Sequence, residues 1–158
     1  MKEKNLNKDS SAYYENNDYY EIFSKAEDGE NKVADYLKRE AEDKIVLDAG
    51  CGTGKFLNVL ESVSSKYIGV DLSFEQLIKA QSKRSKNTTN FINANLKDIM
   101  LADNSVDLIV SPWVLGTVLD MNERLECLEE LKRVLKPGGK IILIENDEGS
   151  EFEVLRNR

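Results

Sequence analysis

Apolar runs that alternate with amphipathic stretches dominate the chain from residue 31 onward. Five runs predict strands, namely Ile45–Ala49, Tyr67–Asp71, Phe91–Asn93, Val106–Ser111 and Lys140–Glu145. Between them, apolar residues recur at intervals of three and four, which predicts helices over 31–40, 55–63, from 73 into the polar run 82–90, and over 122–135. Because strands and helices alternate, the fold class is α/β with a doubly wound, parallel sheet.

Local signals predict several boundaries of these elements. Ser73 stands three residues before Gln76, a spacing typical of a capping box at the start of a helix. Pro112 is expected to end the fourth strand, and the run 136–139 is expected to end the last helix in a tight turn. Ligands of such sheets bind at the carboxyl ends of the strands, near the first strand, where the winding reverses.

Size and charge narrow the classes of function. The chain has 158 residues and a formal net charge of −7. One domain is predicted over 31–158, preceded by a polar segment over 1–30 whose aromatic residues form a cap. An acidic surface repels phosphate backbones, so nucleic acid is not an expected partner. Neither a signal peptide nor a run of membrane-spanning length is visible, so the expected location is the cytoplasm, with no membrane partner.

The chain contains two cysteines and no histidine. Cys51 and Cys127 lie too far apart for a disulfide framework or a zinc site, and no metal is expected. Since the commonest general base is missing, the chemistry must depend on carboxylates, tyrosines, lysines or positioning alone.

The run from Asp48 to Gly54 is the strongest motif. It places three glycines at alternate positions between a buried strand and a helix, where only glycine lets the backbone turn sharply against a ligand. The dinucleotide fingerprint needs a glycine where Lys55 stands, and the triphosphate loop needs one where Ala49 stands. Phe56 also follows Lys55 where that loop needs serine or threonine, so both readings fail.

Two carboxylates flank this turn. Asp71 ends the second strand about twenty residues after Gly50, where it can accept hydrogen bonds from both hydroxyls of a ribose. Asp48 places a second negative charge beside the turn, which favours a ligand that carries positive charge. The turn therefore predicts a ribose-bearing, cationic ligand.

On these motifs the chain resembles the class I S-adenosylmethionine-dependent methyltransferases of the type 11 kind. The similar segments are 48–54, 69–73, 103–111 and 131–140, in the family's order. The resemblance implies a Rossmann-like, mostly parallel sheet in the order 3-2-1-4-5. It also implies S-adenosylmethionine as cofactor, with S-adenosylhomocysteine as product.

The resemblance also implies roles for individual residues. The glycine turn would pass under the methionine part and the ribose, and Leu72 would pack on the adenine. Asn95, followed by Leu96, stands where relatives often have an acidic residue that binds the adenine amino group. The expected cofactor-binding residues are Asp48, Ala49, Gly50, Cys51, Gly52, Thr53, Gly54, Asp71, Leu72, Asn95, Leu96 and Ser111.

The acceptor side carries fewer signals. The predicted activity is in-line transfer of a methyl group to an unidentified small molecule, a reaction to which alignment makes a large contribution. Tyr14, Tyr20 and Trp113 are substrate-side candidates, and Trp113 is also compatible with simple packing under a helix. Glu145 and Asp147 are candidate bases, with a solvated loop as the alternative.

Three other functions stay open at this point. The chain is compatible with a cofactor-binding module that needs a partner chain, with a protein or RNA methyltransferase, and with a nicotinamide oxidoreductase, which Lys55 opposes. The resemblance also implies an antiparallel hairpin after strand five, for which the sequence ending at Arg158 is too short. Strand five is then an edge strand. We expect it to be covered by the tail Glu148–Arg158, by a second copy or a partner chain, or by residues missing from a shortened chain.

Overall fold

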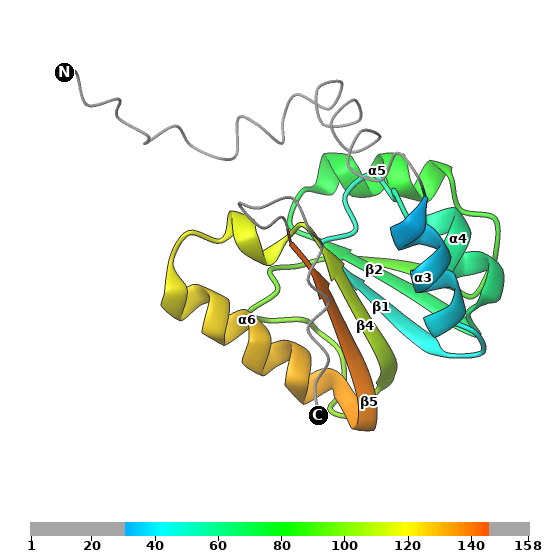
Figure 1. Ribbon diagram of the computed structural model, residues 1–158. Helices are drawn as coiled ribbons and strands as arrows, with labels where there is room; N and C mark the ends of the chain where they lie inside the picture. The colour runs from blue at the N-terminus through cyan, green and yellow to red at the C-terminus, as the bar shows by residue number, and fades with distance from the viewer. Residues whose placement is uncertain (1–30, 146–158) are drawn as a thin grey trace.

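A five-stranded sheet in which every strand pair is parallel forms the centre of the molecule in the computed structural model, which describes residues 31–145 (Figure 1). The strand order is β3-β2-β1-β4-β5, which confirms the predicted Rossmann-like topology. The elements are α3 (Lys32–Glu40), β1 (Ile45–Ala49), α4 (Leu57–Val63), β2 (Lys66–Asp71), α5 (Phe74–Ser82), β3 (Thr89–Asn93), β4 (Val106–Pro112), η1 (Leu115–Thr117), α6 (Met121–Val134) and β5 (Leu135–Ile144).

Helices cover both faces of this sheet. In Figure 1, α3 and α4 lie on one side of the strands and α6 lies on the other. Successive strand residues point to opposite faces, so Val46 packs with Leu37 of α3 and Leu60 of α4. Leu47, the next residue, packs with Leu131 of α6. Apolar side chains are therefore needed on both faces, which explains the continuous apolar strands.

Two predicted boundaries are wrong by several residues. Strand β5 begins at Leu135, so the predicted turn over 136–139 lies inside the strand. The pairing with β4 shifts there from Val106↔Leu135 to Leu108↔Lys140, which leaves the extra residues in a bulge. Helix α4 begins at Leu57 rather than at residue 55, because the turn continues to residue 56.

Two further boundaries differ by one or two residues. Strand β3 begins at Thr89, two residues earlier than its apolar part, and Thr89 pairs with Tyr67 of β2. Pro112 is the last residue of β4 and pairs with Ile144 rather than standing outside the strand. The predicted helix cap is confirmed, since the Ser73 hydroxyl oxygen accepts from the Gln76 N–H at 3.4 Å.

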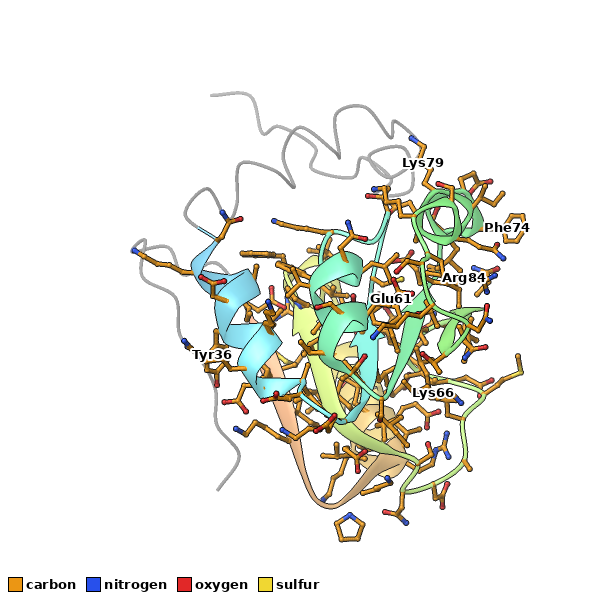
Figure 2. All side chains as sticks on the ribbon, turned by 90° about the vertical axis from the view of Figure 1, so that its right-hand side faces the viewer. Tyr36, Glu61, Lys66, Phe74, Lys79 and Arg84 are labelled. Atoms are coloured by element: carbon orange, nitrogen blue, oxygen red, sulfur yellow. The ribbon has the colours of Figure 1, made fainter. Side chains whose placement is uncertain are left out.

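A buried carboxylate fastens α4 to the segment that leads into β3. The Glu61 carboxylate accepts from the backbone N–H groups of Ser85 and Lys86 and from the hydroxyls of Ser85 and Thr89 (Figure 2). Burial tends to raise its pKa, but these hydrogen bonds outweigh burial and lower it. The sequence, which is polar over 82–90, gave no sign of this contact.

We expect Glu61→Ala to lower the free energy of unfolding by about 2–3 kcal/mol, because four donors lose their acceptor while water reaches only some of them. Urea denaturation followed by circular dichroism measures this change. Glu75→Ala on the exposed side of α5 is the control and should change stability by less than about 0.5 kcal/mol. Equal stability of the two variants would contradict the role assigned to Glu61.

Several expectations lie outside the described residues. They concern the segment 1–30 with Tyr14 and Tyr20, Asp147, and the tail that is one expected cover of β5. Within residues 31–145, β5 pairs only with β4, and no helix has the length and apolar character that crossing a membrane requires.

Candidate functional site

The glycine turn connects β1 to α4 at the carboxyl end of the sheet. Gly50, Gly52 and Gly54 have φ angles of 80°, 54° and 79°, a region that side chains rarely adopt. The N–H groups of Gly50 and Cys51 both donate to the Val70 carbonyl oxygen, at 2.8 and 3.0 Å. The turn is therefore bound to β2 through its own backbone.

The position of Gly50 also has no room for a side chain. A Cβ placed there would lie 2.6 Å from Cγ1 of Val114, which follows β4. Gly138 is a useful contrast, because its φ angle is also positive, at 79°, and a Cβ there would meet nothing within 4 Å. The two positions separate the cost of backbone conformation from the cost of crowding.

We expect Gly50→Ala to destabilise the protein by about 3 kcal/mol, since backbone strain and overpacking against Val114 add. Gly138→Ala should cost only about 1 kcal/mol, since only the strain remains. Thermal unfolding of both variants measures the difference. The double variant Gly50→Ala/Val114→Ala should behave more like Gly138→Ala, and no such recovery would contradict the crowding argument.

Asp71 binds the turn from the end of β2. Its Oδ2 accepts from the Gly52 N–H at 2.8 Å, and its Oδ1 accepts from the Ser73 N–H at 2.9 Å. Burial raises the pKa of Asp71, and these backbone hydrogen bonds oppose the change. Each carboxylate oxygen can accept a second hydrogen bond, so the group can still receive two ribose hydroxyls.

Asp48 lies deeper than expected. It is only 2% exposed, and its Oδ2 accepts from the Tyr67 hydroxyl at 2.8 Å. Burial raises the pKa of Asp48 to about 7, the Tyr67 hydrogen bond opposes that rise, and repulsion from Asp71 adds to it. Asp48 is therefore beneath the turn, where its charge can act on a ligand without touching it.

The expected adenine side is open. Leu72 is 70% exposed, and the Asn93 side chain donates to the backbone oxygens of Asp71 and Leu72. Asn95 is exposed, and its Oδ1 accepts from the Lys97 N–H at 3.0 Å, so that oxygen already has one donor. Leu96 packs in the core rather than facing solvent. Phe74 projects outward from α5 (Figure 2).

Near the end of β4 stands Ser111, an expected cofactor-binding residue, and Trp113, an expected substrate-side residue, follows the strand. Ser111 is fully buried, and its hydroxyl donates to the Ala49 carbonyl oxygen at 3.1 Å, so it supports the turn from behind. Trp113 has a φ angle of 55° and stacks on Phe56 with 6.1 Å between ring centroids. The Lys55 Nζ lies 4.2 Å from the Trp113 ring centroid, within cation–π distance.

Glu145, a candidate base, follows β5 and reaches η1. Burial raises the pKa of its carboxyl, and the backbone N–H groups of Gly116, Leu115 and Val114 oppose that rise. Gly116 leaves the room for this contact, since a Cβ there would lie 2.6 Å from the Glu145 carboxylate. Glu145 thus stabilises the short helix η1, and Val114, which immediately precedes that helix, lies beside Gly50 of the turn.

The structure brings together Asp71, Leu72 and the residues of the glycine turn, with Asp48 and Ser111 as buried support. Asn95 follows the next strand along the sheet. Sequence reasoning missed Tyr67 and Val114. A tyrosine two residues before Gly69 on a buried strand was the available sign of Tyr67, because such a hydroxyl needs a partner. Residues 31–145 contain no group of three side chains suited to a metal ion.

A family model described as a methyltransferase domain matches residues 47–143, more than half of the chain. The chain belongs to the methyltransferase domain family. The match includes the glycine turn, Asp71 and the segment after β4.

Curated relatives of this methyltransferase domain have different acceptors in their names. It is 34% identical over 112 residues to a tRNA (carboxymethyluridine(34)-5-O)-methyltransferase of Arabidopsis thaliana, covering 71% of this chain and 26% of that protein. It is 34% identical over 113 residues to a malonyl-[acyl-carrier protein] O-methyltransferase of Marinomonas, covering 70% of this chain and 41% of that protein. The methyltransferase chain thus spans less than half the length of these relatives.

Solved structures agree on the fold. An S-adenosylmethionine-dependent methyltransferase from Aquifex aeolicus superposes with a TM-score of 0.65 at 26% identity, covering 78% of this chain and 71% of that one. A methyltransferase from Haloferax volcanii, solved in complex with the Trm112 methyltransferase activator, gives a TM-score of 0.70 at 23% identity, covering 89% of this chain and 61% of that one.

Proposed function

We propose that this chain binds S-adenosylmethionine and transfers its methyl group to a small-molecule acceptor. The observation that carries the proposal is the glycine turn held against Asp71 by the hydrogen bond from the Gly52 N–H at 2.8 Å. This arrangement presents backbone without side chains beside a carboxylate suited to a ribose, and Leu72 stands exposed next to it. The residues present therefore fit the cofactor.

The proposed site needs little acid–base machinery from the chain. S-adenosylmethionine, when bound, supplies a methyl group that is already activated for displacement. Asp71 and the turn would hold and orient the ligand, and alignment of this kind is worth about 7–11 kcal/mol of a barrier. Asp48 and Ser111 would keep the turn in place from below, since both are buried and hydrogen-bonded.

The expected acceptor is a small molecule, in the cytoplasm. The net charge of −7 disfavours a nucleic acid, although one relative bears tRNA in its name. Among residues 31–145, the candidate for the acceptor side is Trp113, whose ring lies under the Lys55 ammonium group.

Thermal unfolding with three ligands tests the proposal. A ligand at 100 times its dissociation constant stabilises the folded state by about 2.7 kcal/mol. We expect stabilisation by S-adenosylmethionine and by S-adenosylhomocysteine, and none by NAD. Stabilisation by NAD alone would overturn the proposal in favour of an oxidoreductase. If the two sulfur ligands stabilise the protein, methyl transfer to a panel of acceptors would identify the substrate class.

A second candidate is a cofactor-binding module that acts with a partner chain. It is favoured by the outer edges of β3 and β5, which pair with no strand of residues 31–145. Light scattering distinguishes the two candidates. A monomer that transfers methyl groups would exclude the second, whereas a monomer that binds the cofactor without turnover would favour it.

A further inference from the structure

A tyrosine–carboxylate pair lies directly beneath the glycine turn. Asp48 of β1 and Tyr67 of β2 are 2% and 1% exposed, and the Tyr67 hydroxyl donates to Asp48 Oδ2 at 2.8 Å. Asp48 stands two residues before Gly50, whose N–H binds β2 at the Val70 carbonyl oxygen. The pair is therefore built into the base of the site proposed for the cofactor.

Neighbouring side chains seal this pair from water. Gly69 is paired with Asp48 in the sheet, and a Cβ there would lie 2.8 Å from Cys51 Sγ and 2.9 Å from the Phe91 ring. Phe91 also packs edge-on against the Tyr67 ring, with 6.0 Å between centroids. The missing side chain at Gly69 thus lets a thiol and an aromatic ring close over the carboxylate.

Within residues 31–145, the charged and titratable groups around Asp48 include no cation that binds it. Asp71 repels its charge, and Cys51 and Tyr67 are neutral groups whose pKa values burial raises. Tyr36 of α3 packs against the hydrophobic cluster that contains Tyr67. Glu61 of α4 binds Ser85 and Thr89 instead.

The two lysines near the turn bind elsewhere. Lys55 Nζ lies over the Trp113 ring, and Lys83 Nζ donates to the Thr53 carbonyl oxygen at 2.9 Å. Among the described residues, Asp48 is thus a buried carboxylate supported by a single hydroxyl. Such a group is stabilised strongly by any cation that arrives close to it.

We propose that the Asp48–Tyr67 pair senses the charge of the bound ligand, so that it favours the sulfonium cofactor over the uncharged sulfur of the demethylated product and makes that preference depend on pH. This inference rests on the proposed function, because it assumes that the turn binds S-adenosylmethionine. The two ligands differ at one atom, where the cofactor carries a methyl group and a positive charge. A preference between them therefore reports the charge that the site provides.

The direction of the pH effect follows from linkage. Burial raises the pKa of Asp48 to about 7, so near neutral pH the carboxyl is partly protonated before the ligand binds. A cationic ligand favours the ionised form and lowers the pKa in the complex, so it binds better as the pH rises towards 7 and its affinity levels off above that. Both ligands share the amino group, so their affinity ratio isolates the sulfonium charge.

Calorimetry of both ligands between pH 4.5 and 8.5 tests the proposal. For the native chain, the preference for S-adenosylmethionine over S-adenosylhomocysteine should rise several-fold with pH, between the pKa values of Asp48 in the two complexes, which the charge of the ligand holds below the ligand-free value of about 7. Tyr67→Phe removes the hydrogen bond that favours ionisation, so this rise should move to higher pH and the preference at the native midpoint should fall several-fold. Asp48→Asn should make the preference independent of pH.

Tyr36→Phe is the matched control, because the Tyr36 hydroxyl is buried, belongs to a ring that packs against the cluster containing Tyr67, and has no hydrogen-bond partner in the described part of the chain. Its pH profile should coincide with that of the native chain. A preference that does not vary with pH in the native chain, or an unmoved midpoint in a folded Tyr67→Phe variant, would overturn the proposal. If Tyr67→Phe does not fold, the pH profiles of the native chain and of Asp48→Asn decide. Absence of binding by both ligands at every pH would instead overturn the proposed function itself.

Discussion

Asp71→Ala should weaken the binding of S-adenosylmethionine by about 100-fold or more. The carboxylate would lose two ribose hydroxyls as donors, and hydrogen bonds to a charged group contribute about 1.5–3 kcal/mol each. The same substitution frees the Gly52 and Ser73 N–H groups, so the turn would also lose one of its attachments to β2. Isothermal titration calorimetry measures the loss directly.

Three comparisons make this prediction sharp. S-adenosylhomocysteine has the same ribose and should lose affinity by a similar factor. Asp71→Asn retains one acceptor oxygen and should show a smaller loss. Asp35→Ala, which removes an exposed carboxylate from α3, should leave the affinity unchanged. Native affinity in a folded Asp71→Ala variant would mean that the ligand binds elsewhere.

The sequence predicted the fold because local and global signals agree in this chain. Strands buried on both faces must be apolar throughout, and helices must repeat at three and four residues, so each element is visible from its own residues. The boundaries that the sequence did not predict depend on how a strand pairs with its neighbour. Thr89 and Asn90 extend β3 although they are polar, because β2 supplies hydrogen bonds to their backbone. The bulge over 136–139 likewise depends on the register with β4.

The site was predictable only where a residue belongs to a motif or ends a predicted strand. The glycine turn and Asp71 follow directly from spacing, because the end of each strand fixes where they lie. Tyr67 and Gly69 contribute through contacts across β1 and β2, and these depend on register, which no single segment encodes. Val114 is further from prediction, since its contact with Gly50 depends on the path after β4.

The region that this chain shares with its relatives does not specify one methyl acceptor. Proteins that share this segment include ones named for tRNA, for an acyl-carrier protein and for demethylmenaquinone. Different acceptors therefore accompany the same region of similarity. We infer that acceptor choice depends on parts of the chain that differ among these proteins, whereas the turn and Asp71 concern the ligand they have in common.

Asp48→Asn should change how the free energy of unfolding depends on pH. Between pH 4 and pH 8, the difference between the variant and the native chain should change by about 4 kcal/mol, as expected when a pKa moves from 3.8 to about 7. The raised pKa means that the folded state binds a proton more tightly than the unfolded chain. Its contribution is therefore fully present below pH 4 and is lost as the pH rises to 7. The variant has no such group, so its stability relative to the native chain should increase between pH 4 and pH 8.

Urea denaturation of the ligand-free protein at pH 4.5, 6, 7 and 8 measures this difference, because the other carboxyls contribute equally to both proteins. Asp35→Asn on the exposed side of α3 is the matched control, and its curve should run parallel to that of the native chain. If the Asp48→Asn curve is also parallel, Asp48 is ionised throughout and the buried pair must carry its charge at no cost. If the free energies of unfolding of the two proteins diverge as predicted, the ionised Asp48 destabilises the ligand-free protein near neutral pH. A cationic ligand that binds close to Asp48 would then relieve this destabilisation.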